Sequence, residues 1–206
     1  MHSPNSLPHR GCVLASKPNH PPTEASVRPR RAYSVPCALY LGGDLAFVRL
    51  LRRDDADRLV DFFDSHTPQT IHDRYGYAVT KLPRSRAIQL VSVDQRRNVA
   101  LGVFEAAAGM PLIAVGRYCI TDDPLTAEVA FVVREDRRRL GIATLLLRTL
   151  IAMARERGLR RLSAQVLQDN DAMLRIFRAA GAIAAPIPGA GAVAITIPIR
   201  ERNDQG

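Results

Sequence analysis

The sequence predicts a mixed α/β (α+β) domain with a central sheet of about six or seven strands, mostly antiparallel, flanked by about four helices. Three strand-like apolar runs lie between residues 99 and 133 and are joined by turn residues, which indicates an antiparallel meander. From Gly141 onward, apolar residues recur with the spacing of one helical face. Two more strand-like runs then flank a second helical pattern, so the C-terminal half follows the order β-α-β-α-β.

The first 44 residues differ in composition from the rest of the chain. Half of the 14 prolines fall between Pro4 and Pro36, and the apolar residues there show no sustained period. Such a segment cannot bury enough apolar surface to offset the entropy cost of ordering it. We therefore expect a disordered Pro/Arg-rich tail at residues 1–44, the domain at residues 45–200, and a short polar end at residues 201–206.

Apolar spacing and capping residues predict the elements within the domain. Residues 45–51 have the pattern of a strand, and Asp54 is expected to cap a helix that ends near Phe63. Thr67-Pro68 indicates the start of a short helix, whereas residues 82–93 are ambiguous by periodicity alone. The later strands are expected at 99–104, 112–120, 128–133, 161–167 and 192–199, and the later helices start at Gly141 and at Asp169 or Asn170.

The chain is basic, with a net charge of +9, and its positive charge is concentrated in one segment. Residues 134–161 hold nine arginines and three acidic residues. A basic cluster suggests nucleic acid as a partner. However, the chain has no Trp and only 5% aromatic residues, so side chains on which bases could stack are scarce. Nucleic acid is therefore not the expected partner.

Other classes of protein are also disfavoured by composition. No apolar run approaches the roughly 18 residues that a membrane-spanning helix needs. The cysteines, Cys12, Cys37 and Cys119, are scattered and show neither a disulfide framework nor the spacing of a zinc site. We expect a protein of the reducing cytoplasm that holds no metal.

One loop has the features of a phosphate-binding site. Arg138-x-x-Gly141-x-Ala143 lies between a strand-like run and a long amphipathic helix. The first backbone amides of a helix have no acceptor within the helix, and its dipole adds partial positive charge there. Small residues would let a phosphate approach the backbone closely. The alternative is a plain connection whose arginines are solvated.

This segment resembles motif A of the GNAT acetyltransferases, with its Q/R-x-x-G-x-G/A signature. Residues 169–174 and 180–182 resemble motif B of the same family, and the likeness extends over about residues 45–198. Within the family, the chain most resembles the GNAT domain of bacterial protein lysine acetyltransferases of the Pat type. The residues that carry this likeness are Phe47 to Asp55, Phe62-Phe63, Thr67-Pro68 and Arg74-Tyr75. The resemblance also implies a helix at residues 82–93.

The resemblance implies acetyl-CoA as co-substrate and assigns a set of residues to it. Backbone groups of Phe131 and Val133 would contact the pantetheine arm. Asn170 would lie near this arm, although it is equally suited to cap a helix. The pyrophosphate would lie against the loop residues Arg138, Arg139, Gly141, Ile142, Ala143 and Thr144.

The same resemblance implies that Glu128 is the general base. A lysine amine is mostly protonated at neutral pH, so a base must remove a proton before the amine attacks a thioester. Glu128 could instead be an exposed strand residue or a salt-bridge partner, and Asp122 and Asp123 are weaker candidates for the base. Phe177 occupies the position at which many family members carry a tyrosine that protonates the leaving thiolate. Ala182 stands where a bulky aromatic residue is common.

The acceptor remains open at this level. The resemblance favours a protein lysine, and the alternatives are a small amine or a non-catalytic module that binds acetyl-CoA. A monomer or a homodimer is expected.

Overall fold

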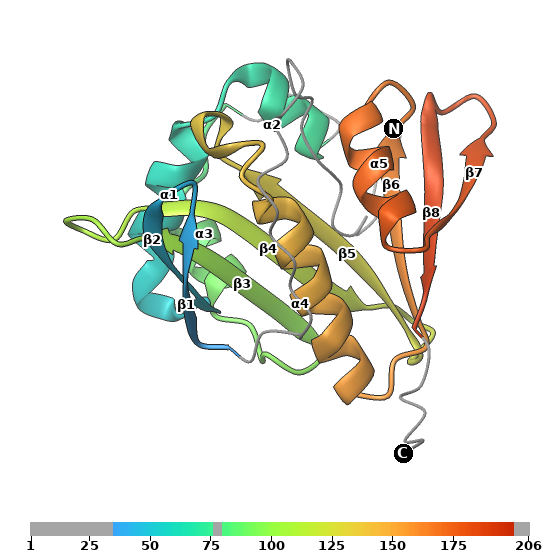
Figure 1. Cartoon of the computed structure of the whole chain (residues 1–206), viewed down its shortest axis with the longest axis horizontal. Coiled ribbons are helices and arrows are strands. Elements are labelled where there is room, and N and C mark those ends of the chain that lie inside the picture. The colour runs from blue at the N-terminus through green and yellow to red at the C-terminus, as the bar shows by residue number, and fades with distance from the viewer. Residues whose placement is uncertain (1–34, 76–79, 200–206) are drawn as a thin grey trace, which may run out of the picture.

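The computed structural model describes residues 35–75 and 80–199, which form one sheet with helices on both faces (Figure 1). The sheet has eight strands in the order β1-β2-β3-β4-β5-β6-β8-β7. Neighbouring strands run antiparallel, except that β5 and β6 run parallel. The strands are β1 Cys37–Leu41, β2 Asp44–Leu50, β3 Asn98–Glu105, β4 Leu112–Ile120, β5 Thr126–Val133, β6 Arg161–Leu167, β7 Ile183–Ile187 and β8 Ala192–Pro198.

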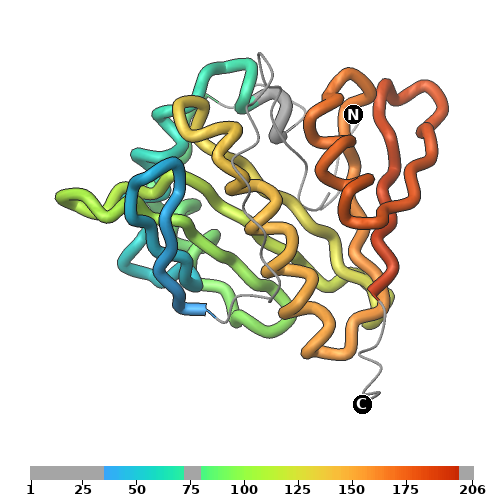
Figure 2. Tube along the Cα trace, viewed as in Figure 1, coloured from blue at the N-terminus to red at the C-terminus, as the bar shows by residue number. Residues whose placement is uncertain are grey.

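The helices divide between the two faces of the sheet. Figure 1 and the trace in Figure 2 show α4 crossing one face and α5 lying over β6, with α1 and α3 on the opposite side. The α-helices are α1 Ala56–Asp64, α2 Pro68–Tyr75, α3 Arg84–Val91, α4 Ile142–Glu156 and α5 Asp171–Ala179, and two short 3-10 turns are η1 Arg53–Asp55 and η2 Glu135–Arg137.

Each face of the sheet has its own hydrophobic core, because side chains alternate along every strand. On β5, Phe131 and its odd-numbered neighbours pack against α4 and α5. Val132 faces the other way and packs with the cluster that includes Phe62 of α1 and Val91 of α3. The predicted mixed fold and its antiparallel meander are therefore confirmed, and residues 82–93 contain a helix.

The predicted boundary of the N-terminal tail is wrong. β1 lies within residues 1–44 and pairs with β2 over its whole length, from Cys37 opposite Val48 to Leu41 opposite Asp44. The Gly42-Gly43 pair between two apolar runs is a hairpin signal, and the hairpin buries Leu41 and Ala46 in the core. Residues 1–34 and 201–206, the remainder of the predicted tail and polar end, lie outside the described residues.

Two further expectations need correction. β7 was not predicted because Pro186 interrupts its pattern, and a proline is tolerated there because β7 is an edge strand. Asp54 does not cap the first helix. Asp55 is instead the structural carboxylate: it is fully buried, accepts from the Arg52 amide at 2.9 Å, and binds Arg49 through both oxygens at 2.6 and 2.7 Å.

Within the described part of the chain, no helix is both long enough and apolar enough to cross a membrane.

Candidate active site

The parallel strands β5 and β6 separate soon after they begin. Their pairing is confined to Thr126 with Arg161, Ala127 with Leu162, and Glu128 with Ser163. Beyond these pairs, β5 continues to Val133 and β6 to Leu167 without pairing to each other. Figure 1 shows the two strands diverging toward their carboxyl ends. The edge of β5 that faces β6 is therefore open to a ligand.

The backbone of β5 presents alternate residues to this open edge. The Arg134 amide donates to Ile113 O of β4 at 2.9 Å, so the even-numbered residues direct their backbone groups toward β4. Phe131 and Val133 therefore direct theirs toward the β6 side. An extended ligand could bind along this edge as an additional strand would.

The N-terminus of α4 follows the carboxyl end of β5. Gly141 is the N-cap of α4 and has a φ of 76°, in the left-handed region. A Cβ at Gly141 would meet no atom within 4 Å, so glycine is required there for its backbone conformation and the backbone is accessible. Ile142, Ala143 and Thr144 form the first turn, whose amides have no acceptor within the helix. This end of the helix can bind an anion.

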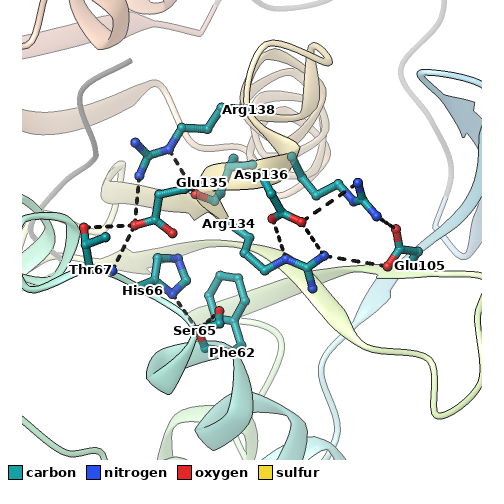
Figure 3. A network of polar contacts seen from close by, with 11 residues as sticks. Phe62, Ser65, His66, Thr67, Glu105, Arg134, Glu135, Asp136 and Arg138 are labelled. Atoms are coloured by element: carbon teal, nitrogen blue, oxygen red, sulfur yellow. Dashed lines mark hydrogen bonds and ion pairs between the residues drawn. The ribbon is translucent and has the colours of Figure 1, made fainter. Parts of the chain in front are cut away.

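The loop arginines are occupied by protein contacts rather than directed at an open site. Arg138 donates to the Thr70 hydroxyl at 2.8 Å and lies 3.5 Å from a Glu135 oxygen (Figure 3). Arg134 binds Asp136 at 2.6 Å, and Arg137 binds Glu105. Arg134, Arg137 and Arg138 therefore hold the loop to neighbouring side chains. Arg139 is exposed and adopts a φ of 65°.

Glu135 attaches this loop to the start of α2. One of its carboxylate oxygens accepts from the Thr67 amide at 3.1 Å and from the Thr67 hydroxyl (Figure 3). The same oxygen also accepts from the Thr70 hydroxyl. Burial raises the pKa of Glu135, but the hydrogen bonds from Thr70 and Thr67 outweigh it and leave the pKa below its usual value. Sequence reasoning missed this contact, which joins residues 65 or more positions apart.

Glu128 lies on the sheet face opposite α4, at the point where β5 and β6 separate. Its register partners are Cys119 on β4 and Ser163 on β6, and its side chain is half-buried. Arg117 lies two residues before Cys119 on β4 and is therefore on the same face. Sequence reasoning also overlooked Arg117, although an arginine inside the apolar run of β4 was a signal for it.

The alternative bases are less suitable. Asp123 belongs to the turn between β4 and β5, where it accepts from Thr126, from the Leu125 amide and from Arg161. These hydrogen bonds lower the pKa of Asp123 to about 2. A carboxylate of such low basicity is a poor proton acceptor near neutral pH. Asp122 is an exposed residue of the same turn.

Asn170 and Phe177 lie on the β6 side of the separation. Asn170 is fully buried and caps α5, because its side-chain oxygen accepts from the Met173 amide at 3.2 Å. This confirms the capping interpretation. Phe177 is also fully buried, and its ring centroid lies 5.7 Å from that of Phe131. The residue at the tyrosine position is thus part of the core.

Among the described residues, no group of three His, Cys, Asp or Glu side chains is arranged to hold a metal ion.

Known proteins share this arrangement. The acetyltransferase (GNAT) family matches residues 60–182. The chain is similar to Acetyltransferase Pat of Mycolicibacterium smegmatis, with 32% identity over 142 residues that cover 68% of this chain and 42% of that protein. It is also similar to Acetyltransferase PA5475 of Pseudomonas aeruginosa, with 26% identity over 140 residues that cover 68% of this chain and 75% of that protein. The chain therefore spans less than half the length of the mycobacterial relative.

Solved structures give the same result. The GNAT domain of S. lividans PAT matches with a TM-score of 0.72 and 29% identity, covering 81% of this chain and 99% of that domain. A cAMP-binding acyltransferase from Mycobacterium smegmatis matches with a TM-score of 0.56 and 27% identity, covering 81% of this chain and 48% of that protein. These findings confirm the GNAT fold and the resemblance to Pat-type domains.

Proposed function

The chain belongs to the acetyltransferase (GNAT) family, and on that premise we propose that it transfers the acetyl group of acetyl-CoA to a protein lysine, with Glu128 as the general base. The separation of β5 and β6 beside the N-terminus of α4 is the observation that carries this proposal. It provides a strand edge for an extended arm and a helix end for phosphate in one place. The proposal includes a cytoplasmic location.

In the proposed complex, the pantetheine arm lies along the open edge of β5. The amide and carbonyl groups of Phe131 and Val133 are directed there, so they can bond to the amides of the arm as a neighbouring strand would. Asn170 lies on the other side of the separation and holds the start of α5 in place through its cap. The pyrophosphate binds the amides of Gly141, Ile142, Ala143 and Thr144, with Arg138 and Arg139 preceding them in the loop.

Glu128 is suited to act on the amine because of its position at the end of the β5–β6 pairing. A thioester held along β5 would lie beside this residue. Glu128 would accept a proton from the ammonium group, directly or through one water, and the neutral amine would then attack the acetyl carbonyl. The bond from carbon to sulfur breaks, coenzyme A leaves as a thiolate, and the nitrogen releases its second proton to solvent as the amide forms. Since Phe177 carries no proton to donate, the thiolate takes its proton from solvent or leaves unprotonated.

Two rows of uncharged side chains on the β6 side of Glu128 favour a macromolecular acceptor over a small amine. Paired residues of a sheet share a face, so the Glu128 row continues through Ser163 and Thr196 to Ile183. The next row holds Gln165, Ala194 and Ala185. These residues are half-buried or exposed, and Ile183 is 66% exposed. An extended polypeptide that carries the lysine could lie across these rows.

The proposal is tested by titrating the protein with acetyl-CoA and then measuring release of free coenzyme A thiol with a panel of acceptors. The panel contains lysine-bearing peptides, the same peptides with lysine replaced by arginine, polyamines and free amino acids. We expect binding of acetyl-CoA and transfer to the lysine peptides alone. Transfer confined to the small amines would overturn the protein acceptor. Binding without transfer to any amine would favour a module that only reports acetyl-CoA.

A further inference from the structure

A small cavity lies on the Glu128 side of the sheet, between the strands and the helices α1 and α3. Its walls are mostly apolar and include Leu51, Phe62, Val115 and Val132. Its volume is about 40 Å³. Because one water needs roughly 10–15 Å³ by this measure, the cavity exceeds the space of a single water and admits only a small ligand.

Arg117 contributes a charge to this apolar cavity. It lines the cavity from β4, and its Nε is buried without a hydrogen-bond partner. A Nη2 contact to Leu90 O at 3.4 Å is long and weak. Among the residues whose side chains the structure describes, no carboxylate forms an ion pair with Arg117. Arg117 as a whole is half-buried, but its Nε–H lies buried in an apolar wall. A buried polar group is normally paired, and an anionic acceptor suits a guanidinium best, so an anionic group is expected at this position.

His66 contributes a hydrogen-bond acceptor to the same cavity, where Arg117 contributes a donor. Its Nδ1 lies 2.5 Å from Phe62 O, and a carbonyl oxygen only accepts, so Nδ1 carries the proton. Burial lowers the pKa of His66 and favours the neutral ring. In this tautomer Nε2 is an acceptor, and it is buried without a partner. The cavity therefore offers one unused donor and one unused acceptor.

We propose that this cavity binds a small carboxylate that also carries a hydrogen-bond donor, namely a short hydroxy- or amino-carboxylate. The carboxylate accepts from the Nε–H of Arg117, the hydroxyl or ammonium group donates to Nε2 of His66, and the carbon chain contacts the apolar wall. A charge-assisted hydrogen bond to arginine is stronger than a neutral one. The proposal does not depend on acetyl-CoA binding, and the cavity binds its ligand whether or not the protein transfers acetyl groups.

Three probes of nearly equal size test each contact in turn. L-Lactate has the carboxylate and the donor, propionate lacks the donor, and L-lactamide lacks the charge. Binding to the full chain is measured by NMR titration or calorimetry. We expect lactate to bind best. Lactamide should be weaker by about tenfold or more, the loss of one charge-assisted hydrogen bond, and propionate weaker by about three- to tenfold, the loss of one neutral hydrogen bond. L-Alanine tests the amino class, and formation of N-acetylalanine shows whether such a ligand is also an acyl acceptor.

Two variants locate the site. Arg117→Met keeps an unbranched apolar stem and removes the guanidinium group, so we expect it to fold and to lose lactate and propionate binding alike. His66→Phe should reduce lactate to the level of propionate and leave propionate unchanged. Arg148→Met, at an exposed position of α4, is the matched control for loss of an arginine. Equal binding of lactate and lactamide, or lactate binding that persists in Arg117→Met, would overturn the proposal. Failure of every probe to bind wild type would overturn it too and would leave ordered water as the occupant.

Discussion

Glu128 on β5 lies opposite Ser163 on β6, and this is the last residue pair before the two parallel strands separate. The position joins two requirements of acyl transfer from a bound thioester. The strand edge beyond it is open to the donor, and the sheet face around it is open to the acceptor. Glu128 thus lies where both substrates would meet.

Replacing Glu128 by Gln removes the proposed base and keeps the size of the side chain. We expect the rate of acetyl transfer at neutral pH to fall by about 10²- to 10⁴-fold, the usual contribution of a general base, with acetyl-CoA affinity unchanged. Steady-state kinetics and calorimetry on the same preparation measure the two quantities. Asp123→Asn is the matched control, because a carboxylate with a pKa of about 2 cannot act as the base. Equal rates for Glu128→Gln and wild type would remove Glu128 from the mechanism.

Gly141 and Gly158 permit a controlled test of the phosphate site. Their φ angles are 76° and 74°, and a Cβ at either position meets no atom within 4 Å. Glutamate at either position therefore introduces the same backbone strain, of about 1–2 kcal/mol. Only Gly141 is at the N-terminus of α4, where the proposed pyrophosphate lies.

We expect Gly141→Glu to abolish acetyl-CoA binding in a calorimetric titration and Gly158→Glu to leave it intact. Thermal unfolding of both variants checks that they are destabilised to a similar extent. Loss of binding in both variants would show that strain, and not the phosphate site, is responsible.

The elements that the sequence predicted well are those with a local cause. The long helix α4 follows from its apolar spacing, and its start follows from Gly141 at the change of period. β1 and β7 are short edge strands, each paired with the strand that follows it in the chain, and the pattern of β7 is interrupted by Pro186. The candidate base was identified through family resemblance, whereas the cavity at Arg117 could be found only from the three-dimensional structure. No local pattern brings α1 of residues 56–64 over a strand that starts at residue 112.

Glu135 holds the phosphate loop against α2, so its removal should affect a site that it does not touch. Glu135→Ala eliminates the hydrogen bonds to Thr67 and Thr70 and leaves Arg138 without its nearby carboxylate. We expect acetyl-CoA to bind about tenfold more weakly, because the loop amides lose their fixed positions. Asp136→Ala removes the same charge from the adjacent residue, which pairs with Arg134 instead. A similar change of affinity in both variants would indicate a charge effect and contradict the positioning role of Glu135.

His66 should make the stability of the domain depend on pH in a defined window. Burial lowers the pKa of His66 in the folded protein, while the Glu135 carboxylate and the Phe62 carbonyl raise it and the Arg138 guanidinium lowers it further. As the pH falls, His66 of the unfolded chain is therefore protonated first, near the ordinary histidine pKa of about 6.5. The contribution of neutral His66 to stability is complete above that pH and decreases as the pH falls toward the folded pKa. The slope is at most about 1.4 kcal/mol per pH unit.

In His66→Asn, the amide can still donate to Phe62 O, but the titrating group is gone. We expect the free energy of unfolding of wild type, relative to this variant, to decrease between pH 7 and pH 5, as measured by urea denaturation at each pH. A constant difference across that range would mean that burial does not hold the ring neutral. In that case Nε2 would be a donor when protonated, and the cavity beside Arg117 would select a ligand with acceptors at both ends.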